Sequence, residues 1–224
     1  MCSPSVVRFA EAALKEADVR GRAVLEVGAL DVNGTVRPVV QALHPASYIG
    51  VDLQAGPGVD VVCDATGVLT RFGEQSFDIV ISTEVLEHVR DWRTVVRNLK
   101  LALKPGGLLL LTTRSPGVDF HRHPFDFWRY DKSDFEFIFS DLIIEELQLD
   151  PDDPGLFLKA RRPTPFSERD LSGHELYSIL RRKRIRDVRP RDLLLFQARY
   201  RLIRLWLDLL PKSARRAVRE RLLR

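Results

Sequence analysis

Short apolar runs alternate with amphipathic segments over the first 160 residues, and this pattern most narrows the possible folds. The runs expected to be strands are 23–29, 47–53, 59–65, 77–83 and 108–113. The segments with helical spacing are 4–19, 35–43 and 92–103. Apolar strands without polar alternation are typical of a parallel sheet covered on both faces. The alternation therefore predicts a doubly wound α/β fold.

The chain changes character beyond this region. Two apolar segments within 141–161 are expected to close the sheet as an antiparallel pair. The string "RRPTPF" at 161–166 carries two prolines, which is typical of a linker. We therefore expect one domain at 1–162 and a basic helical extension at 163–224.

The net charge of +4 hides an asymmetry between these regions. Residues 161–224 contain 19 Arg and Lys against 7 Asp and Glu, whereas residues 1–160 contain 16 against 24. Within the basic part, residues 193–210 carry a broad apolar helical face. We expect a homodimer through this segment, with attachment to an anionic membrane or an anionic polymer as the alternatives.

Other features predict a cytoplasmic protein. The N-terminus has charges spread along it and no apolar core of a signal peptide. No window approaches the roughly 18–20 apolar residues of a membrane span. Two cysteines, Cys2 and Cys63, cannot form a disulfide framework.

The string "VLEVGALDVNG" at 24–34 combines a strand, an acid and a glycine-containing loop before a helix. Gly28 lets backbone approach a ligand closely, and the helix start offers free N–H groups. Asp52 ends the next strand, where a carboxylate can accept hydrogen bonds from both hydroxyls of a ribose. A nucleotide site is predicted, with an unliganded Rossmann-like turn as the alternative. The absence of G-x-G-x-x-G disfavours a nicotinamide dehydrogenase.

Taken in order, "VLEVGA", "YIGVDL", "VVCDA", "FDIVISTEVLEHV" and "LKPGGLLLLTT" resemble the class I methyltransferases that use S-adenosylmethionine. The resemblance covers residues 20–161 and implies a Rossmann-like sheet of seven strands with the cofactor across the strand ends. It places Glu26 and Gly28 near the methionine part, Asp52 at the ribose, Asp64 and Ala65 at the adenine, and Ser82 and Thr83 beside the methyl group. The chain departs from the usual glycine pattern at Leu30, and Asn33 with Gly34 is expected to supply the tight turn.

The string "STEVLEHV" places Glu84, Glu87 and His88 at i, i+3 and i+4. If it begins a helix, the three side chains share one face. Two carboxylates so close repel each other unless a cation lies between them. The alternative is a charged first turn, because acids favour a helix N-terminus.

The string "DFHRHPFDFWRY" at 119–130 follows the fifth strand, so it should reach the same edge of the sheet. Two carboxylates and two imidazoles would form a mixed oxygen and nitrogen site for Mg²⁺ or Mn²⁺. E-x-x-E-H with a downstream histidine resembles the metal site of small-RNA 3′-terminal 2′-O-methyltransferases and of ubiquinone-pathway O-methyltransferases. The residues leave open which of His121 and His123 is the ligand and which takes the proton, and the match of "HPFD" to the RNA enzymes favours the ligands Glu84, Glu87, His88 and His123. Catalytic roles then fall to His121, as the base, and to His88.

Three acceptors fit a metal-bound diol: a sugar, a catechol-type quinone precursor and an RNA 2′-hydroxyl. The loop "HPFDFWRY" resembles methyltransferases found beside glycosyltransferases in bacterial polysaccharide pathways, and an excess of 28 Arg over 7 Lys suggests a GC-rich bacterial genome. We therefore expect a sugar hydroxyl as acceptor. Nucleic acid is disfavoured because no separate RNA-binding module is visible. A non-catalytic S-adenosylmethionine-binding partner protein is the alternative of another class.

Overall fold

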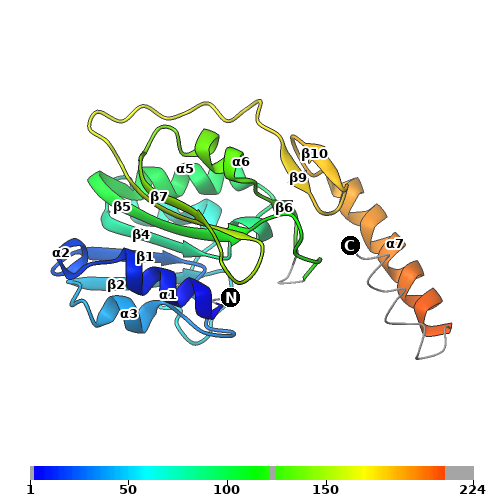
Figure 1. Ribbon diagram of the computed structural model, residues 1–224, viewed down its shortest axis with the longest axis horizontal. Coiled ribbons are helices and arrows are strands. Elements are labelled where there is room, and N and C mark those ends of the chain that lie inside the picture. Colours follow the sequence, from blue (N-terminus) through cyan, green and yellow to red (C-terminus); the bar gives the residue numbers. More distant parts are fainter. Residues whose placement is uncertain (1–2, 122–124, 210–224) are drawn as a thin grey trace.

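The computed structural model describes residues 3–121 and 125–209, with side chains of the last helix as far as Leu202. Its centre is a seven-stranded sheet in the order β3-β2-β1-β4-β5-β8-β7 (Figure 1). The strands are β1 Ala23–Val27, β2 Ser47–Asp52, β3 Val61–Val62, β4 Phe77–Thr83, β5 Leu103–Arg114, β7 Ile143–Leu149 and β8 Gly155–Arg161. The first five strands are parallel, and β8 is antiparallel to both neighbours. The predicted fold class is confirmed.

Helices cover both faces of the sheet, as the apolar strands require. The first face carries α1 Pro4–Ala13, α2 Glu16–Val19 and α3 Arg37–Gln41, and the second carries α4 Val68–Phe72, α5 Trp92–Ala102 and α6 Lys132–Ile138 (Figure 1). On β4, Ile79 and Ile81 pack toward α1, whereas Val80 packs toward α5. The period of two in a strand thus divides one apolar run between two cores.

Several elements differ from their predicted bounds. The helix expected at 4–19 is interrupted because Leu14 and Lys15 are extended, and the Lys15 backbone N–H donates to the Asp18 carboxylate at 3.4 Å. The strand expected at 59–65 is reduced to β3, because Asp64 begins the 3₁₀ turn Ala65–Gly67 by accepting from the backbone N–H of Thr66. β5 begins five residues before the predicted 108, and it includes the "KPGG" segment.

The segment after the two prolines returns to the body of the molecule. Leu171, Leu176 and Val188 are buried in the same core as α5. The hairpin of β9 Leu176–Ser178 and β10 Lys183–Ile185 pairs with β6 Trp128–Arg129 to form a small second sheet. α7 Pro190–Leu209 then extends away from the large sheet (Figure 1). Within the described residues, no helix has the length and apolarity to cross a bilayer.

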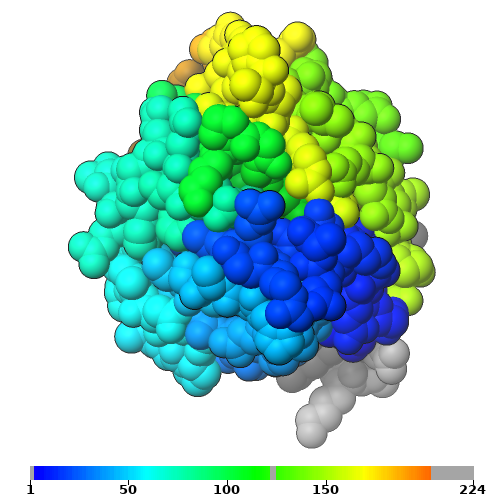
Figure 2. Space-filling view, turned by 90° about the vertical axis from the view of Figure 1, so that its left-hand side faces the viewer, coloured from blue at the N-terminus to red at the C-terminus, as the bar shows by residue number. Residues whose placement is uncertain are grey.

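The N-terminal helix is tied to the turn between β7 and β8. The Ser5 hydroxyl donates to Asp150 at 3.0 Å, and Arg8 forms an ion pair with Asp152 at 2.5 Å. Figure 2 shows the dark-blue N-terminal residues beside the yellow-green residues of this region. These contacts fix the turn that places Asp153 and Pro154 at the candidate site described below.

Candidate active site

A cavity of about 390 Å³ lies at the carboxyl ends of β1, β2 and β4. Four of the residues predicted to bind the cofactor line it: Gly28, Asp52, Asp64 and Ala65. Glu26, Asn33, Gly34, Ser82 and Thr83 are not among its lining residues. The cavity therefore lies where parallel strands of a doubly wound sheet commonly bind a ligand.

Gly28 is required by its surroundings. Its φ is +87°, and an added Cβ would lie 2.0 Å from Cγ2 of Val85. Leu30, at the position where a second glycine was expected, lines the cavity and donates its backbone N–H to Asp52 at 3.3 Å. The loop therefore follows the end of β2 closely without the second glycine.

Both cavity aspartates are oriented by the backbone. The Asp52 carboxylate accepts from the N–H groups of Leu30 at 3.3 Å and Gln54 at 3.1 Å. Asp64 accepts from the backbone N–H and the hydroxyl of Thr66, at 2.8 and 2.7 Å. A carboxylate offers about four acceptor positions, so each retains capacity for a ligand donor.

The other residues predicted to bind the cofactor lie outside the lining of the cavity. Glu26 is buried and accepts from the Tyr48 hydroxyl at 2.6 Å. Burial raises the pKa of Glu26 to about 7, against that hydrogen bond and the charge of Arg37. The turn at Gly34 is closed by Asp31, which accepts from the Gly34 N–H at 2.8 Å. Ser82 and Thr83 are buried on β4.

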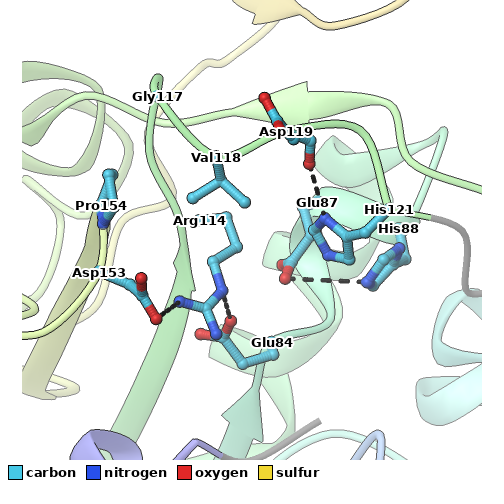
Figure 3. A pocket seen from close by; sticks show the side chains of 10 residues that line it. All are labelled: Glu84, Glu87, His88, Arg114, Gly117, Val118, Asp119, His121, Asp153 and Pro154. Carbon is cyan, nitrogen blue, oxygen red and sulfur yellow. Dashed lines mark hydrogen bonds and ion pairs between the residues drawn. The ribbon is translucent and has the colours of Figure 1, made fainter. Parts of the chain in front are cut away.

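A second pocket, of about 400 Å³, shares lining residues with the first, and Figure 3 shows the residues that line it. Its lining residues are Glu84, Glu87, His88, Arg114, Gly117, Val118, Asp119, His121, Asp153 and Pro154. Glu84 and His88 line both hollows. The two hollows therefore share a wall, and we name the second the acceptor pocket, after the role proposed for it below.

The "STEVLEHV" string does not begin an α-helix. Glu84 has a φ of 56°, and a 3₁₀ turn, Leu86–His88, follows it. The left-handed residue directs Glu84 toward β5, where its carboxylate pairs with Arg114 and accepts from the Thr112 hydroxyl at 2.9 Å. Burial and the Glu87 carboxylate raise the pKa of Glu84, against the charge of Arg114. Glu84 is therefore occupied by protein partners rather than aligned with Glu87.

Glu87 is fully buried, with one oxygen satisfied and one free. Oε2 accepts from the Thr113 hydroxyl at 2.8 Å, whereas Oε1 has no hydrogen-bond partner among the described residues. Oε1 lies 3.9 Å from Nε2 of His88. Burial disfavours the charged form, yet His88 and the Thr113 hydroxyl hold the pKa of Glu87 below its ordinary value. An anionic oxygen is thus available at the acceptor pocket.

The backbone of residues 125–127 orients His88. Its Nδ1 lies 2.5 Å from the backbone oxygen of Phe125. A backbone oxygen only accepts, so Nδ1 is the donor, and in the neutral imidazole Nε2 keeps a lone pair for a cation or a proton. The Phe127 N–H also donates to the Glu87 backbone oxygen at 2.8 Å. Residues 125–127 therefore hold the whole 3₁₀ turn in place.

His121 meets His88 across the pocket, with ring centroids 5.0 Å apart and planes at 86° (Figure 3). Its backbone N–H donates to Asp126 at 2.9 Å. Asp126 is itself paired with buried Arg129 at 2.7 Å, and Arg129 also donates to the backbone oxygens of Val118 and Asp119. Burial lowers the pKa of His121, against the charge of Asp126. The Asp126–Arg129 pair thus shapes the loop that carries His121.

Glu87, His88 and His121 each offer a ligand atom, and these atoms lie within 4.8 Å of one another. The structure therefore brings together three of the residues predicted for metal binding and catalysis. Glu84 is outside this cluster, and His123 lies outside the described residues. Sequence analysis missed Arg114, although its place at the end of the "LLLLTTR" strand puts it at the same edge of the sheet.

A family model described as a methyltransferase domain matches residues 4–147, well over half of the chain. The chain therefore belongs to this family of methyltransferase domains. Two solved structures show the same fold. An S-adenosylmethionine dependent methyltransferase from Mesorhizobium loti has a TM-score of 0.52 at 20% identity, over 71% of this chain and 99% of that one. The Burkholderia thailandensis 1,6-didemethyltoxoflavin-N1-methyltransferase, with bound 1,6-didemethyltoxoflavin and S-adenosylhomocysteine, has a TM-score of 0.55 at 18% identity, over 70% and 78%.

Curated relatives are similar over part of their length. The ubiquinone biosynthesis O-methyltransferase of Idiomarina loihiensis is 32% identical over 111 residues, which are 44% of this chain and 44% of the relative. The enzyme of the same name from Chromobacterium violaceum is 31% identical over 112 residues, 44% and 47% of the two. A phthiotriol/phenolphthiotriol dimycocerosates methyltransferase of Mycobacterium tuberculosis is 35% identical over 104 residues, 41% and 37%. The chain spans less than half the length of these relatives.

Proposed function

We propose that this chain is an S-adenosylmethionine-dependent O-methyltransferase that acts on adjacent hydroxyls of a small molecule held by a divalent cation. One observation carries the proposal. Ligand atoms of Glu87, His88 and His121 converge within 4.8 Å in a pocket that shares Glu84 and His88 with the cofactor cavity. An acceptor held by these atoms would lie next to a ligand of the cofactor cavity.

The first cavity fits S-adenosylmethionine. Its glycine at 28 leaves room where a Cβ would strike Val85, and the Asp52 carboxylate suits the ribose hydroxyls. Asp64 and Ala65 would border the adenine. When bound, this cofactor supplies a methyl group on a positively charged sulfur, ready for transfer to a nucleophile. Glu84 and His88 form the wall between the two hollows.

The ligand set fits a divalent cation. Glu87 offers a buried oxygen without a partner among the described residues, and His88 offers Nε2 because its Nδ1 is held by Phe125. One carboxylate and two imidazoles suit Mn²⁺, and a carboxylate with further oxygen ligands suits Mg²⁺. Such a cation lowers the pKa of a hydroxyl that it binds and orients a diol. The protein fixes the ligands through Thr113, Phe125 and Asp126.

The charge of the acceptor pocket favours a neutral acceptor. Glu84 is paired with Arg114, so the lining keeps the carboxylates of Glu87, Asp119 and Asp153, whose combined charge exceeds that of one divalent cation. An RNA end or a nucleotide-linked sugar would bring phosphates to this lining and be repelled. Two neutral diols remain. The names of the curated relatives favour the phenolic quinone precursor over the sugar, although the loop resemblance favours the sugar.

The test is methyl transfer from S-adenosylmethionine to three acceptors, followed by mass spectrometry. The acceptors are a 4-alkylcatechol, a methyl glycoside with a cis-diol, and an RNA oligonucleotide with a free 2′,3′ end. We expect methylation of the alkylcatechol in the presence of Mg²⁺ or Mn²⁺, and loss of it after chelation. Methylation of the glycoside alone would replace the phenolic acceptor by a sugar. Full activity after exhaustive chelation would remove the cation from the proposal.

A further inference from the structure

α7 presents apolar side chains on two opposite faces. On one face, Phe196 and Tyr200 contact the ring of Phe120, with centroids 4.7 and 5.8 Å apart. At about 100° per residue, Leu194, Leu195 and Leu202 fall together on the opposite face. These three leucines are 66%, 61% and 66% exposed. The inner face therefore holds α7 to the body, and the outer face is a stripe that none of the described residues covers.

Exposed basic side chains lie on α7 itself, at Arg191, Arg199 and Arg201, and on the segment before it, at Lys183 and Arg189. Residues 181–202 contain nine Arg or Lys and two acids. Both acids are already paired, Asp187 with Arg93 at 3.0 Å and Asp192 with Arg181 at 3.2 Å. The surface around the leucines is therefore strongly cationic.

We propose that the outer face of α7 docks on an anionic lipid surface. An apolar stripe rimmed by arginines is the pattern of a helix that lies in the plane of a membrane interface. The leucines would enter the acyl boundary, while Arg199 and Arg201 would meet the headgroups. α7 would lie on the bilayer rather than span it, in keeping with its charge content.

A second copy of the chain suits this surface less well. A stable interface buries about 800 Å² from each partner, and three leucines provide only part of that. Two copies joined through the stripe would also bring Arg191, Arg199 and Arg201 of one chain against those of the other. Charge complementarity therefore selects an anionic surface, and self-association becomes an outcome that the experiment must detect.

The docked helix would lie next to the acceptor pocket. Phe120, which packs on Phe196 and Tyr200, stands between Asp119 and His121, and both of these line the pocket. An acceptor dissolved in the lipid would thus have a short path to the site. The docking itself does not rest on the proposed function, because it is measured without any methyl transfer.

The experiment is flotation of the full chain with vesicles of phosphatidylcholine alone or mixed with phosphatidylglycerol. We expect binding to the anionic vesicles only, and weaker binding as NaCl rises from about 50 to 500 mM. The double variant Leu194→Gln/Leu202→Gln should lower the affinity at least about tenfold, as should Arg199→Gln/Arg201→Gln. Leu149→Gln is the matched control, because Leu149 is 64% exposed on β7. Its binding should equal that of the wild type.

Circular dichroism and thermal melting establish that each variant keeps its fold. Absence of binding to anionic vesicles by the wild type would overturn the proposal. So would equal binding by the Leu194→Gln/Leu202→Gln variant and the control. Light scattering tests whether a second copy of the chain occupies the stripe instead. A dimeric wild type that becomes monomeric in the Leu194→Gln/Leu202→Gln variant would assign the stripe to a second copy.

Discussion

Glu87 and His88, neighbours in the chain, present Oε1 and Nε2 3.9 Å apart at the acceptor pocket. The other polar atom of each side chain is held by the protein, Oε2 by Thr113 and Nδ1 by Phe125. A cation is a natural occupant between these two free atoms, since it would satisfy the oxygen and use the lone pair of the nitrogen. The predictions on metal binding follow from this relationship.

Glu87→Gln should weaken Mn²⁺ binding. The substitution keeps the shape of the side chain and removes the anionic oxygen. We expect at least about a tenfold loss of affinity, because even partners outside the ligand set commonly contribute that much. Titration calorimetry with Mn²⁺ measures it, and Glu74→Gln, at an exposed turn, is the control. Equal affinities for both variants and the wild type would contradict the site.

His121→Asn separates a ligand from a base. If His121 binds the cation, as its place in the cluster indicates, the affinity for Mn²⁺ should fall as it does for Glu87→Gln. If it only accepts a proton, the affinity should stay constant while kcat falls by about 10²–10⁴. Calorimetry and initial rates at saturating Mn²⁺ distinguish the two. Unchanged affinity and unchanged rate would exclude His121 from the site.

Asp52→Ala should abolish most of the affinity for S-adenosylmethionine while leaving the fold intact. Hydrogen bonds to a charged group contribute about 1.5–3 kcal/mol each, so the loss should be at least about tenfold. Calorimetry gives the affinity, and circular dichroism reports the fold. Asp170→Asn is the control, because Asp170 is exposed, accepts hydrogen bonds from Ser172 of its own turn and does not line the cavity. Unchanged affinity for Asp52→Ala would place the ribose elsewhere.

The strands and the cavity could be predicted from sequence because they depend on local patterns. Apolar runs indicate the strands. Gly28 directly follows β1 and Asp52 ends β2, so both residues lie at the same edge of the parallel sheet. Glu84 could not be placed in this way. Its left-handed backbone and its pairing with Arg114 on β5 bring together residues 30 positions apart. Spacing within one string carries no information on such a partner.

Local sequence patterns also could not predict that the chain packs back onto the core after residue 166. The two prolines are typical of a linker, yet Leu171, Leu176 and Val188 after them are buried in the core. Their burial depends on the hairpin of β9 and β10 pairing with β6, which lies about 50 residues earlier. The placement of His121 likewise depends on the buried Asp126–Arg129 pair.

Gly28→Ala should destabilise the protein for two separable reasons. A non-glycine residue at a φ of +87° is strained by about 1–2 kcal/mol, and the new Cβ would lie 2.0 Å from Val85 Cγ2. Adding Val85→Ala should remove the clash but leave the backbone strain. In the Val85→Ala background, Gly28→Ala should therefore lower the free energy of unfolding by less than it does in the wild type. Urea unfolding of the four proteins gives this cycle. Additive losses would show that the two residues do not meet.

Glu26 should make stability depend on pH. Burial raises its pKa from 4.5 to about 7 in the folded chain, so the folded state favours the protonated form. The stabilisation is complete below pH 4.5 and is lost as pH rises through 7. Glu26→Gln should therefore match the wild type at pH 4.5 and exceed it by about 3 kcal/mol above pH 8, at 1.36 kcal/mol per unit of pKa. Urea unfolding across this range tests it. A difference that is constant with pH would contradict the shift.

The acceptor pocket should discriminate by charge. Glu87, Asp119 and Asp153 line it beside the Glu84–Arg114 pair, and their combined charge exceeds that of one divalent cation. An acceptor with an added negative charge should therefore react more slowly than its neutral isostere, by roughly tenfold for one charge at an effective dielectric constant near 20. The comparison is 3,4-dihydroxyphenylacetate against its amide, as the ratio of kcat/KM. Asp153→Asn should bring this ratio closer to one, because it removes a carboxylate from the pocket lining. The Asp153 carboxylate lies 4.0 Å from Arg114. Glu74→Gln is the control, since Glu74 lies at an exposed turn and does not line the pocket. The same ratio in all three proteins would show that the lining carboxylates do not select the acceptor.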